Sequence, residues 1–221
     1  MKILIKRYGE GCWILGRFKS KVNCSTRKLK QIKRLILKIA FVVFNDLTLL
    51  DFVGVYDTVT RLKTLKYKTD LKWDICASTD MVRDNHGLKI MPDKVRNDLG
   101  KYDAVIIPGG IGTRSLQNDN EFIEWIKTAA NVQHKISVCT GSLILGAAGF
   151  LKGKKATTNF NEYETLKQYC GEVIEKKIVK DQDVITAGAV SSSIDLGLYL
   201  CEKWAGTEAK EKIKKMIDYP Y

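Results

Sequence analysis

The sequence predicts an α/β fold with a mostly parallel sheet that is covered by helices on both faces. Short apolar runs of strand length alternate along the chain with segments whose apolar residues recur at helical spacing. These runs are continuously apolar rather than alternating, which is typical of parallel strands buried on both faces. The 221 residues suffice for one large domain, or for one domain with an extension.

The first strand begins abruptly at Ile39, and the other elements follow in alternation. Predicted strands cover 39–44, 73–78, 104–107, 135–138 and 184–187, and residues 87–92 are expected in a short hairpin. Predicted helices cover 49–59, 121–132, 142–150, 191–204 and 207–217. In such sheets the functional groups collect beyond the C-terminal ends of the strands.

The positive charge is concentrated at the N-terminus. The net charge is +12, but residues 1–38 hold 12 Lys or Arg and only one acidic residue, Glu10, so the remaining chain is nearly neutral. We therefore predict a basic N-terminal extension over 1–37, disordered or helical, followed by a domain over 38–221. The extension could bind nucleic-acid phosphates non-specifically, but a solvated extension is favoured.

The six cysteines are scattered and form no Cys-x-x-Cys pair. This pattern disfavours a structural zinc site and a thioredoxin-like motif, and free thiols suggest a reducing compartment. The first residues do not resemble a secretory signal, and no uncharged apolar run reaches about 18 residues. We expect a cytoplasmic protein with no membrane span and no bound metal.

Cys139 is the strongest candidate for a reactive group. A predicted strand ends at Val138, and a helix rich in small residues starts almost at once, so Cys139 lies on a tight strand-to-helix turn of the kind called a nucleophile elbow. Unpaired N–H groups at the helix start are expected to lower the pKa of the thiol. The alternative is a buried structural cysteine.

A glycine-rich turn follows the strand over 104–107. Gly109, Gly110, Ile111 and Gly112 could direct backbone N–H groups toward one point and, with the N–H of Thr140, form an oxyanion hole. The alternative is a flexible turn. A phosphate loop is disfavoured because no Lys-Ser or Lys-Thr follows.

Asp51 lies among apolar residues just past the first strand. Partial desolvation of its carboxyl group would raise its pKa and suit it to proton transfer. The alternative is a carboxylate that caps the helix start.

Together these motifs resemble the ThiJ/PfpI superfamily, which is class I glutamine amidotransferase-like, and in particular its isonitrile hydratase-like branch and the related domains of some AraC-type regulators. The resemblance covers residues 38 to about 206. It rests, in chain order, on Leu-Asp-Phe-Val-Gly at 50–54, Ile-Pro-Gly-Gly-Ile-Gly at 107–112, Val-Cys-Thr-Gly at 138–141, Gly-Ala-Ala-Gly-Phe-Leu at 146–151 and Ala-Thr-Thr at 156–158.

The resemblance implies a flavodoxin-like three-layer sandwich that forms a homodimer and needs no cofactor. Cys139 would be the nucleophile, Asp51 the acid beside it, and Thr140 an assisting group. The implied enzyme is a hydro-lyase that adds water to an isonitrile to give an N-substituted formamide. Glyoxalase- or deglycase-like chemistry on reactive carbonyls, and a redox or ligand sensor that uses the same cysteine, remain alternatives. A DNA-binding regulator is disfavoured because the one helix expected after Gly206 is too little for a helix-turn-helix.

Two positions depart from family patterns. The protease-like branch has His immediately after the cysteine, where this chain has Thr140, which counts against peptidase activity. The hydratase-like pattern ends in Ala-Thr-Thr-His, whereas the fourth residue here is Asn159, which we expect to bind substrate.

The remaining aromatic and histidine side chains have simpler interpretations. Phe160 and Tyr163 could line the pocket, but core positions are favoured. His86, in the hairpin turn, and His134, at the start of a strand, are expected on the surface and away from Cys139. Cys76, Cys170 and Cys201 are interpreted as packing residues.

Overall fold

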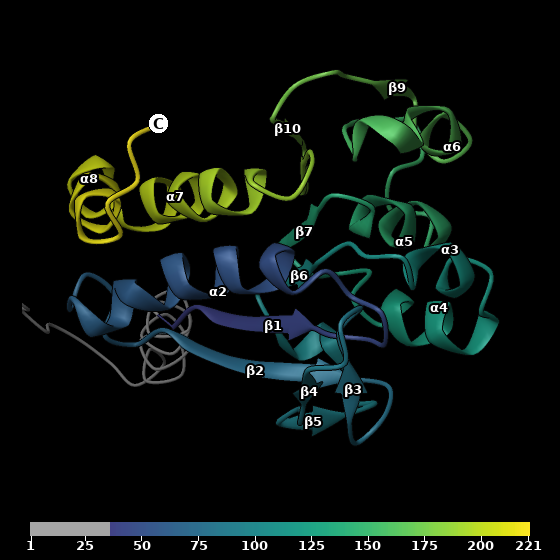
Figure 1. Cartoon of the computed structure of the whole chain (residues 1–221), viewed down its shortest axis with the longest axis horizontal. Helices are drawn as coiled ribbons and strands as arrows, with labels where there is room; N and C mark the ends of the chain where they lie inside the picture. The colour runs from purple at the N-terminus through teal and green to yellow at the C-terminus, as the bar shows by residue number, and fades with distance from the viewer. Residues whose placement is uncertain (1–35) are drawn as a thin grey trace, which may run out of the picture. The chain divides into compact units, whose positions relative to one another are not determined.

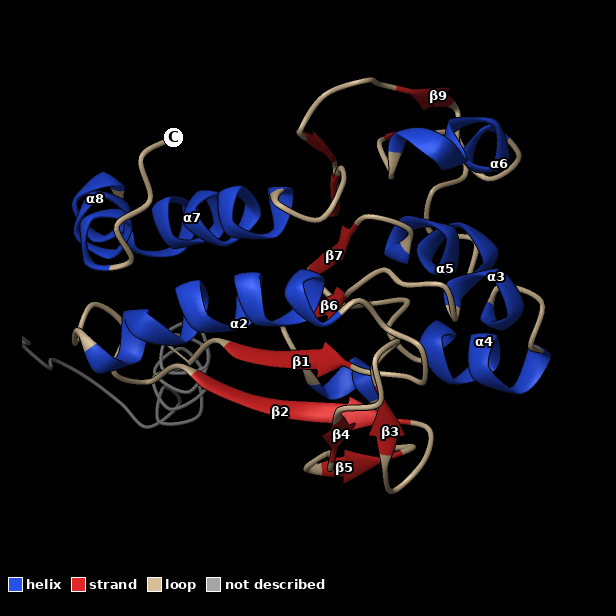
Figure 2. Ribbon diagram, in the orientation of Figure 1, coloured by secondary structure: helices blue, strands red, loops and turns tan. Residues whose placement is uncertain are grey.

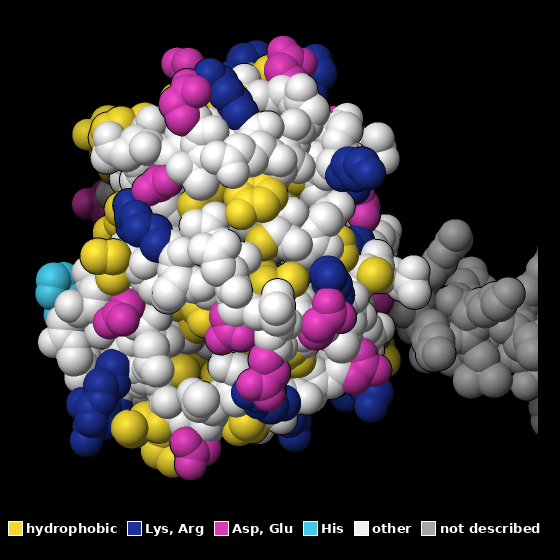
Figure 3. Space-filling model, turned by 90° about the vertical axis from the view of Figure 1, so that its right-hand side faces the viewer, with side chains coloured by type: hydrophobic (Ala, Val, Ile, Leu, Met, Phe, Trp, Pro, Cys, Tyr) yellow, Lys and Arg dark blue, Asp and Glu magenta, His cyan; other side chains and the backbone are white. Residues whose placement is uncertain are grey.

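The computed structural model describes residues 36–221, so the extension predicted over 1–37, with its possible helix, lies almost wholly outside the described residues. Within this part of the chain, none of the helices combines the length and apolar character that a membrane span requires. Charged side chains of both signs are interspersed on the face shown in Figure 3.

A seven-stranded sheet forms the centre of the domain, in the order β10-β11-β7-β6-β1-β2-β5 (Figures 1 and 2). All neighbours are parallel except β10 and β11. The strands are β1 (Lys38–Val42), β2 (Lys72–Ala77), β5 (Lys94–Val95), β6 (Ala104–Ile107), β7 (His134–Val138), β10 (Ile178–Asp181) and β11 (Val184–Ala187). Two small pairs lie outside this sheet: β3 (Val82–Arg83) with β4 (Lys89–Ile90), and β8 (Lys155–Ala156) with β9 (Glu172–Val173).

The strand order places helices on both faces of the sheet. Crossovers between parallel strands are right-handed, and the chain moves toward β2 after β1 but toward β11 after β6, so the two sets of helices cover opposite faces. Helices α2 (Leu49–Thr64), α7 (Ser192–Ala205) and α8 (Thr207–Met216) form one set. Helices α4 (Asn120–Lys127) and α5 (Gly141–Ala147) belong to the other set. Short helices α3 (Thr113–Leu116) and α6 (Tyr163–Lys167) and the 3₁₀ turns η1 (Leu99–Lys101) and η2 (Phe160–Glu162) complete the chain. The arrangement is a flavodoxin-like sandwich, as predicted.

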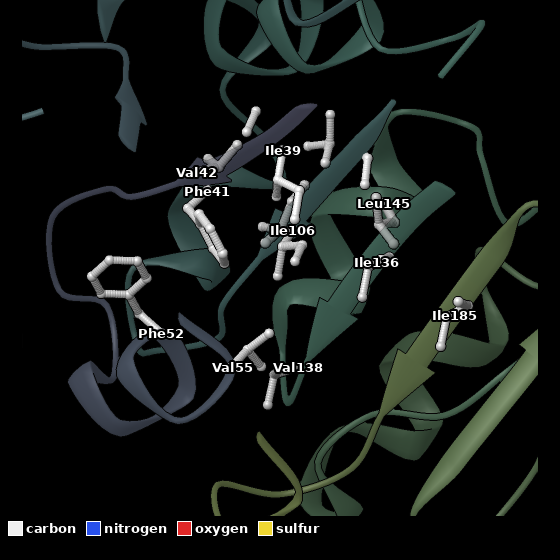
Figure 4. Packing of buried hydrophobic residues seen from close by; sticks show 14 of the residues in the cluster. Ile39, Phe41, Val42, Phe52, Val55, Ile106, Ile136, Val138, Leu145 and Ile185 are labelled. Atoms are coloured by element: carbon white, nitrogen blue, oxygen red, sulfur yellow. The ribbon is translucent and has the colours of Figure 1, made fainter. Parts of the chain in front are cut away.

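Apolar side chains of β1, β6 and β7 pack against α2 (Figure 4). Phe41 of β1 makes edge contacts with the rings of Phe52 and Tyr56 on α2, at centroid distances of 6.0 and 5.2 Å. Helices α2 and α7 pack closely because Gly54 and Gly197 carry no Cβ, which would collide with the partner helix. Burial of apolar surface contributes roughly 25 cal/mol per Å² to stability, so these contacts hold α2 against both β1 and α7.

The five predicted strands are present within one or two residues of their expected bounds, and the expected hairpin arm over 87–92 contains β4, which pairs with β3. Strands β3, β5, β8, β9 and β10 were not predicted. The helix expected over 121–132 ends at Lys127. Its predicted last turn is lost because the hydroxyl group of Thr128 donates to the carbonyl of Trp125 at 2.7 Å, and the following backbone bonds are of the tighter three-residue type.

Candidate active site

Cys139 directly follows β7 and has φ 52°, a left-handed conformation that is uncommon for a residue with a side chain. Its N–H donates to the carbonyl groups of Ala187, the last residue of β11, and of Gly188, both at 2.9 Å. Its own carbonyl accepts from the hydroxyl groups of Thr158 at 3.0 Å and Ser142 at 3.2 Å. The surrounding chain thus holds the predicted elbow in a conformation that costs of order 1–3 kcal/mol.

The loop after β1 is hydrogen-bonded to the glycine-rich loop after β6. The N–H of Thr48 donates to the carbonyl of Gly109 at 2.9 Å, and the N–H of Gly112 donates to the carbonyl of Asp46 at 3.2 Å. Gly110 has φ 142°, and a Cβ there would collide with the backbone of the first loop. These contacts place the first turn of α2, and with it Asp51, beside the loop that precedes α3.

The Asp51 carboxyl group is fully buried. Its Oδ2 accepts from the N–H of Gly109 at 3.0 Å, and its Oδ1 has no hydrogen-bond partner among residues 36–221. Burial raises the pKa of Asp51 to about 7, and this effect outweighs hydrogen bonds from Gly109 and from the Cys139 thiol. The predicted rise in pKa is confirmed, and the group can exchange a proton near neutral pH.

The Cys139 thiol is also buried, with 5% of the residue exposed. Burial and the negative charge of Asp51 raise the pKa of Cys139 to about 11, although the Asn159 amide and the N–H of Thr140 act in the opposite direction. The lowered thiol pKa that we predicted from the helix start is therefore wrong. The N–H effect exists, but desolvation and the neighbouring carboxylate are stronger.

Gly109 lies between the two reactive side chains. A Cβ at this position would lie 2.7 Å from Asp51 Oδ2, 2.7 Å from the Thr140 nitrogen and 2.8 Å from the Cys139 Cβ. Because real Cβ atoms do not come this close to other heavy atoms, only glycine lets the carboxyl group, the elbow and the loop meet.

The N–H groups of the glycine-rich loop have a different task from the one predicted. The N–H of Gly109 donates to Asp51, and the N–H of Gly110 donates to Thr140 Oγ1 at 3.0 Å, while Thr140 Oγ1 is 3.1 Å from the Gly110 carbonyl. With Gly112 also bonded to the first loop, these three N–H groups have protein acceptors and are not aimed at an oxyanion. Ile111, whose side chain is 62% exposed, lies at the outside of the turn.

Asn159 occupies the position where the hydratase-like pattern has His, and its amide contacts the reactive sulfur. Asn159 Nδ2 lies 3.4 Å from Cys139 Sγ, within range for a hydrogen bond to sulfur. Its Oδ1 accepts from the N–H of Asn161 at 3.0 Å, as a cap of η2. This second bond fixes the orientation of the amide, so the group that faces the sulfur is a donor.

Phe160 corrects one of our expectations, because it is 64% exposed and not a core residue. Its position in the turn η2, directly after Asn159, turns it outward. Arg114 and Glu162 form an ion pair at 2.6 Å that ties α3 to the same turn. No spacing pattern in the sequence indicated this ion pair. The hydrogen bond from Thr158 to the Cys139 carbonyl was also not predicted, although Thr158 belongs to the Ala-Thr-Thr motif.

The two histidines lie away from the site, as predicted. His134 is the first residue of β7, at the opposite end of that strand from Cys139, and His86 is exposed in the turn between β3 and β4. Cys76 and Cys201 are buried, Cys170 is half-buried, and all three are free thiols. Within residues 36–221, no group of three His, Cys, Asp or Glu side chains is placed to hold a metal ion.

The chain is thus an α/β protein with a buried thiol on a left-handed elbow and a buried carboxyl group beside it, at the C-terminal edge of a parallel sheet. The chain belongs to the DJ-1/PfpI family, whose model matches residues 37–203. It is 31% identical over 185 residues to an isonitrile hydratase of Pseudomonas putida, covering 83% of this chain and 78% of that protein.

Solved structures agree with this assignment. A THiJ/PfpI family protein from Pseudomonas syringae superposes with a TM-score of 0.75 at 29% identity, covering 84% of this chain and 76% of that one. The DJ-1beta protein of Drosophila melanogaster superposes with a TM-score of 0.72 over 84% of this chain and all of that one. At 19% identity, the second likeness concerns the fold alone.

Proposed function

We propose that this protein is a cysteine-dependent hydro-lyase that adds water to an isonitrile and releases an N-substituted formamide. The observation that carries the proposal is the buried pair of Cys139 and Asp51, with the pKa of the carboxyl group raised to about 7. The similarity to the Pseudomonas putida isonitrile hydratase supports the choice of substrate class. The implied homodimer and cytoplasmic location are part of the same proposal.

In the first step, protonated Asp51 gives its proton to the terminal carbon of R–N≡C. The Cys139 sulfur adds to that carbon, forming the C–S bond, while the thiol proton passes to the Asp51 carboxylate. The product is a thioimidate, R–N=CH–S–Cys139, beside a carboxyl group that is again protonated. This order of events does not require a free thiolate, which fits a thiol whose pKa is raised to about 11.

In the second step, Asp51 protonates the thioimidate nitrogen and then takes a proton from water, whose oxygen adds to the carbon. The tetrahedral intermediate collapses as the C–S bond breaks, its hydroxyl proton returns to sulfur, and R–NH–CHO leaves. Asp51 ends protonated and Cys139 ends as a thiol, so the cycle closes with the uptake of one water and no cofactor.

Thr140 and Asn159 act on the sulfur rather than on the proton transfers. The Asn159 amide and the Thr140 N–H both favour negative charge on Cys139 Sγ, which develops as the C–S bond forms and breaks. The Thr140 hydroxyl group joins the elbow to Gly110 and keeps the loop that carries Asp51's hydrogen-bond donor in place.

A redox sensor receives less support. Thiols that oxidise quickly are exposed and have a lowered pKa, whereas Cys139 is buried and its pKa is raised. An enzyme that acts on reactive carbonyls would use the same thiol. The geometry of the site therefore does not separate this activity from isonitrile hydration, and the two must be separated by assays with each substrate.

The test is formation of N-cyclohexylformamide from cyclohexyl isocyanide by the wild type and by Cys139→Ala, with loss of methylglyoxal followed in parallel. Cys170→Ala is the matched control, because it removes a free thiol that is half-buried elsewhere in the domain. We expect the wild type and the control to form formamide and Cys139→Ala to form none.

Full hydration by Cys139→Ala or Cys139→Ser would contradict the covalent mechanism. Loss of methylglyoxal without formation of formamide, by a folded wild-type protein, would replace the isonitrile with a carbonyl substrate.

A further inference from the structure

A surface hollow away from Cys139 extends from the start of β1 and β2 to Lys94 of β5. Its volume is about 560 Å³, within the range of small-molecule sites, and it is largely open to solvent. Its lining consists of four lysines, one tryptophan and one aspartate: Lys38, Lys63, Lys72, Lys94, Trp73 and Asp74. We call it the lysine pocket.

The single acidic group of the lysine pocket is already engaged. Asp74 Oδ2 accepts from the Tyr102 hydroxyl group at 2.7 Å and lies 3.5 Å from Lys38 Nζ. Lys63, Lys72 and Lys94 form no ion pair with any residue of 36–221. Three lysines thus line one hollow without an ion-pair partner in the described part of the chain, in contrast to the mixed charges on the face in Figure 3.

This arrangement is unfavourable for the protein alone. Lys38 and Lys72 are register partners at the start of the neighbouring parallel strands β1 and β2, and their like charges repel each other. A bound anion with several negative charges would remove the repulsion. Clefts lined by one sign of charge also concentrate counter-ions from solution.

Trp73 adds an apolar wall to the lysine pocket. Its indole lies under Lys63 Nζ, at 5.3 Å from the ring centroid, and against the edge of Tyr56. These contacts hold the Lys63 ammonium group over the pocket, where a cation–π interaction favours it. The pocket therefore has at least one cation that is held in place by an aromatic ring.

We propose that the lysine pocket binds a multivalent phosphate anion, either the phosphate chain of a free nucleotide or consecutive phosphates of a nucleic-acid strand. Lys38 and Lys72 begin their strands, whereas Cys139 follows the end of a strand parallel to them, so these two lysines lie at the opposite edge of the sheet from the thiol. Lys94 lies on β5, which β6, β1 and β2 separate from β7 in the sheet. Phosphate binding and isonitrile hydration are therefore separate properties, and either can fail alone.

The test measures binding of tripolyphosphate, ATP and a short oligothymidylate to the full-length protein at low salt by calorimetry. The variant Lys63→Gln/Lys72→Gln removes two charges of the pocket. Lys152→Gln/Lys176→Gln is the control, because it removes two exposed lysines that form no ion pair within the described residues. We expect the dissociation constant to rise roughly tenfold in the pocket variant and to stay unchanged in the control.

Pocket-dependent binding of tripolyphosphate would support the proposal, and the larger pocket-dependent loss between ATP and the oligothymidylate would identify the natural source of the phosphates. An equal loss in both double variants, or no loss in either, would overturn it, because binding would then come from the overall positive charge. Absence of binding to all three probes by the wild type would overturn it as well. Isonitrile hydration should be the same in the wild type and in both double variants.

Discussion

Replacing Asp51 by Asn should abolish hydration and yet stabilise the folded protein at alkaline pH. The carboxyl group is fully buried and its pKa is about 7, whereas an unfolded chain gives Asp a pKa of about 3.9. Because the folded pKa is the higher one, the folded state binds the proton more tightly. Its stability relative to the variant is therefore greatest below pH 4 and falls as the pH rises toward 7.

The size of the effect follows from the two pKa values. By linkage, ionisation of Asp51 destabilises the folded state by about 1.5 kcal/mol at pH 5 and by about 4 kcal/mol at pH 8. Asn keeps an oxygen that can accept from the N–H of Gly109 but carries no charge at any of these pH values. The advantage of Asp51→Asn in free energy of unfolding should therefore grow by about 2.5 kcal/mol between pH 5 and pH 8.

The assay is urea unfolding of the wild type, Asp51→Asn and Asp57→Asn at several pH values in this range. Asp57 is a suitable control because it lies on the same helix, is exposed and pairs with Arg61 at the surface. Parallel pH profiles for the wild type and Asp51→Asn would refute the claim that the carboxyl group is held with a raised pKa, and with it the acid role in the mechanism.

Three further variants test the surroundings of the pair. Gly109→Ala places a Cβ 2.7 Å from Asp51 Oδ2, so the rate of hydration should fall by a factor of about 100 and the free energy of unfolding by about 1–3 kcal/mol. Gly188→Ala is the control and should retain activity, because the nearest atom to a Cβ there is at 3.6 Å. Equal losses in the two variants would refute the steric argument. Asn159→Ala removes a hydrogen-bond donor to the Cys139 sulfur, so the pH profile of alkylation of Cys139 by iodoacetamide should move to higher pH. An unchanged profile would show that the amide does not act on the thiol. Asp183→Asn removes the counter-charge of Lys135, which is 2% exposed. Because the Asp183 side chain is itself 36% exposed and its charge is partly screened by water, the change should cost about 1–2 kcal/mol in urea unfolding at pH 7. Since the pKa of Asp183 is lowered to about 2, the difference should persist above about pH 4 and shrink as the pH falls toward 2; a constant difference would contradict the ion-pair explanation.

The parts of the fold with the strongest apolar patterns could be predicted from sequence alone. The buried strands and the elbow at Cys139 are local features, since each depends on a run of neighbouring residues. Strand β10 escaped prediction because it lies at the sheet edge, where only Val179 of its four residues is buried and the polar residues weaken the pattern. The raised pKa of Asp51 was also foreseeable, because apolar neighbours in sequence proved to be apolar neighbours in space.

The details of the site depend on contacts between distant segments, which no local pattern shows. The N–H groups of Gly109 and Gly110 found acceptors on α2 and on the elbow because the loops after β1 and β6 are hydrogen-bonded to each other. The pKa of Cys139 was mispredicted for the same reason. The helix start was visible in the sequence, but the degree of burial and the closeness of Asp51, 88 residues earlier, were not.

The raised pKa of Cys139 is compatible with the proposed nucleophilic role. Asp51, whose negative charge raises the thiol pKa, is also the group that takes the thiol proton in the proposed mechanism. The carboxylate of Asp51 is the second cause of the high pKa of Cys139, after burial, so a negative sulfur beside a negative carboxylate is the arrangement that the site disfavours. Bond formation to an electrophilic carbon removes the charge from sulfur at the moment when the thiol proton moves to Asp51. Near neutral pH the two groups therefore do not both carry a negative charge. In the proposed mechanism, the thiol can lose its proton to Asp51 only after Asp51 has given its own proton to the substrate. If the proposed mechanism holds, the reactivity of Cys139 depends on the presence of a substrate that can be protonated at carbon, and the thiol should oxidise slowly in its absence.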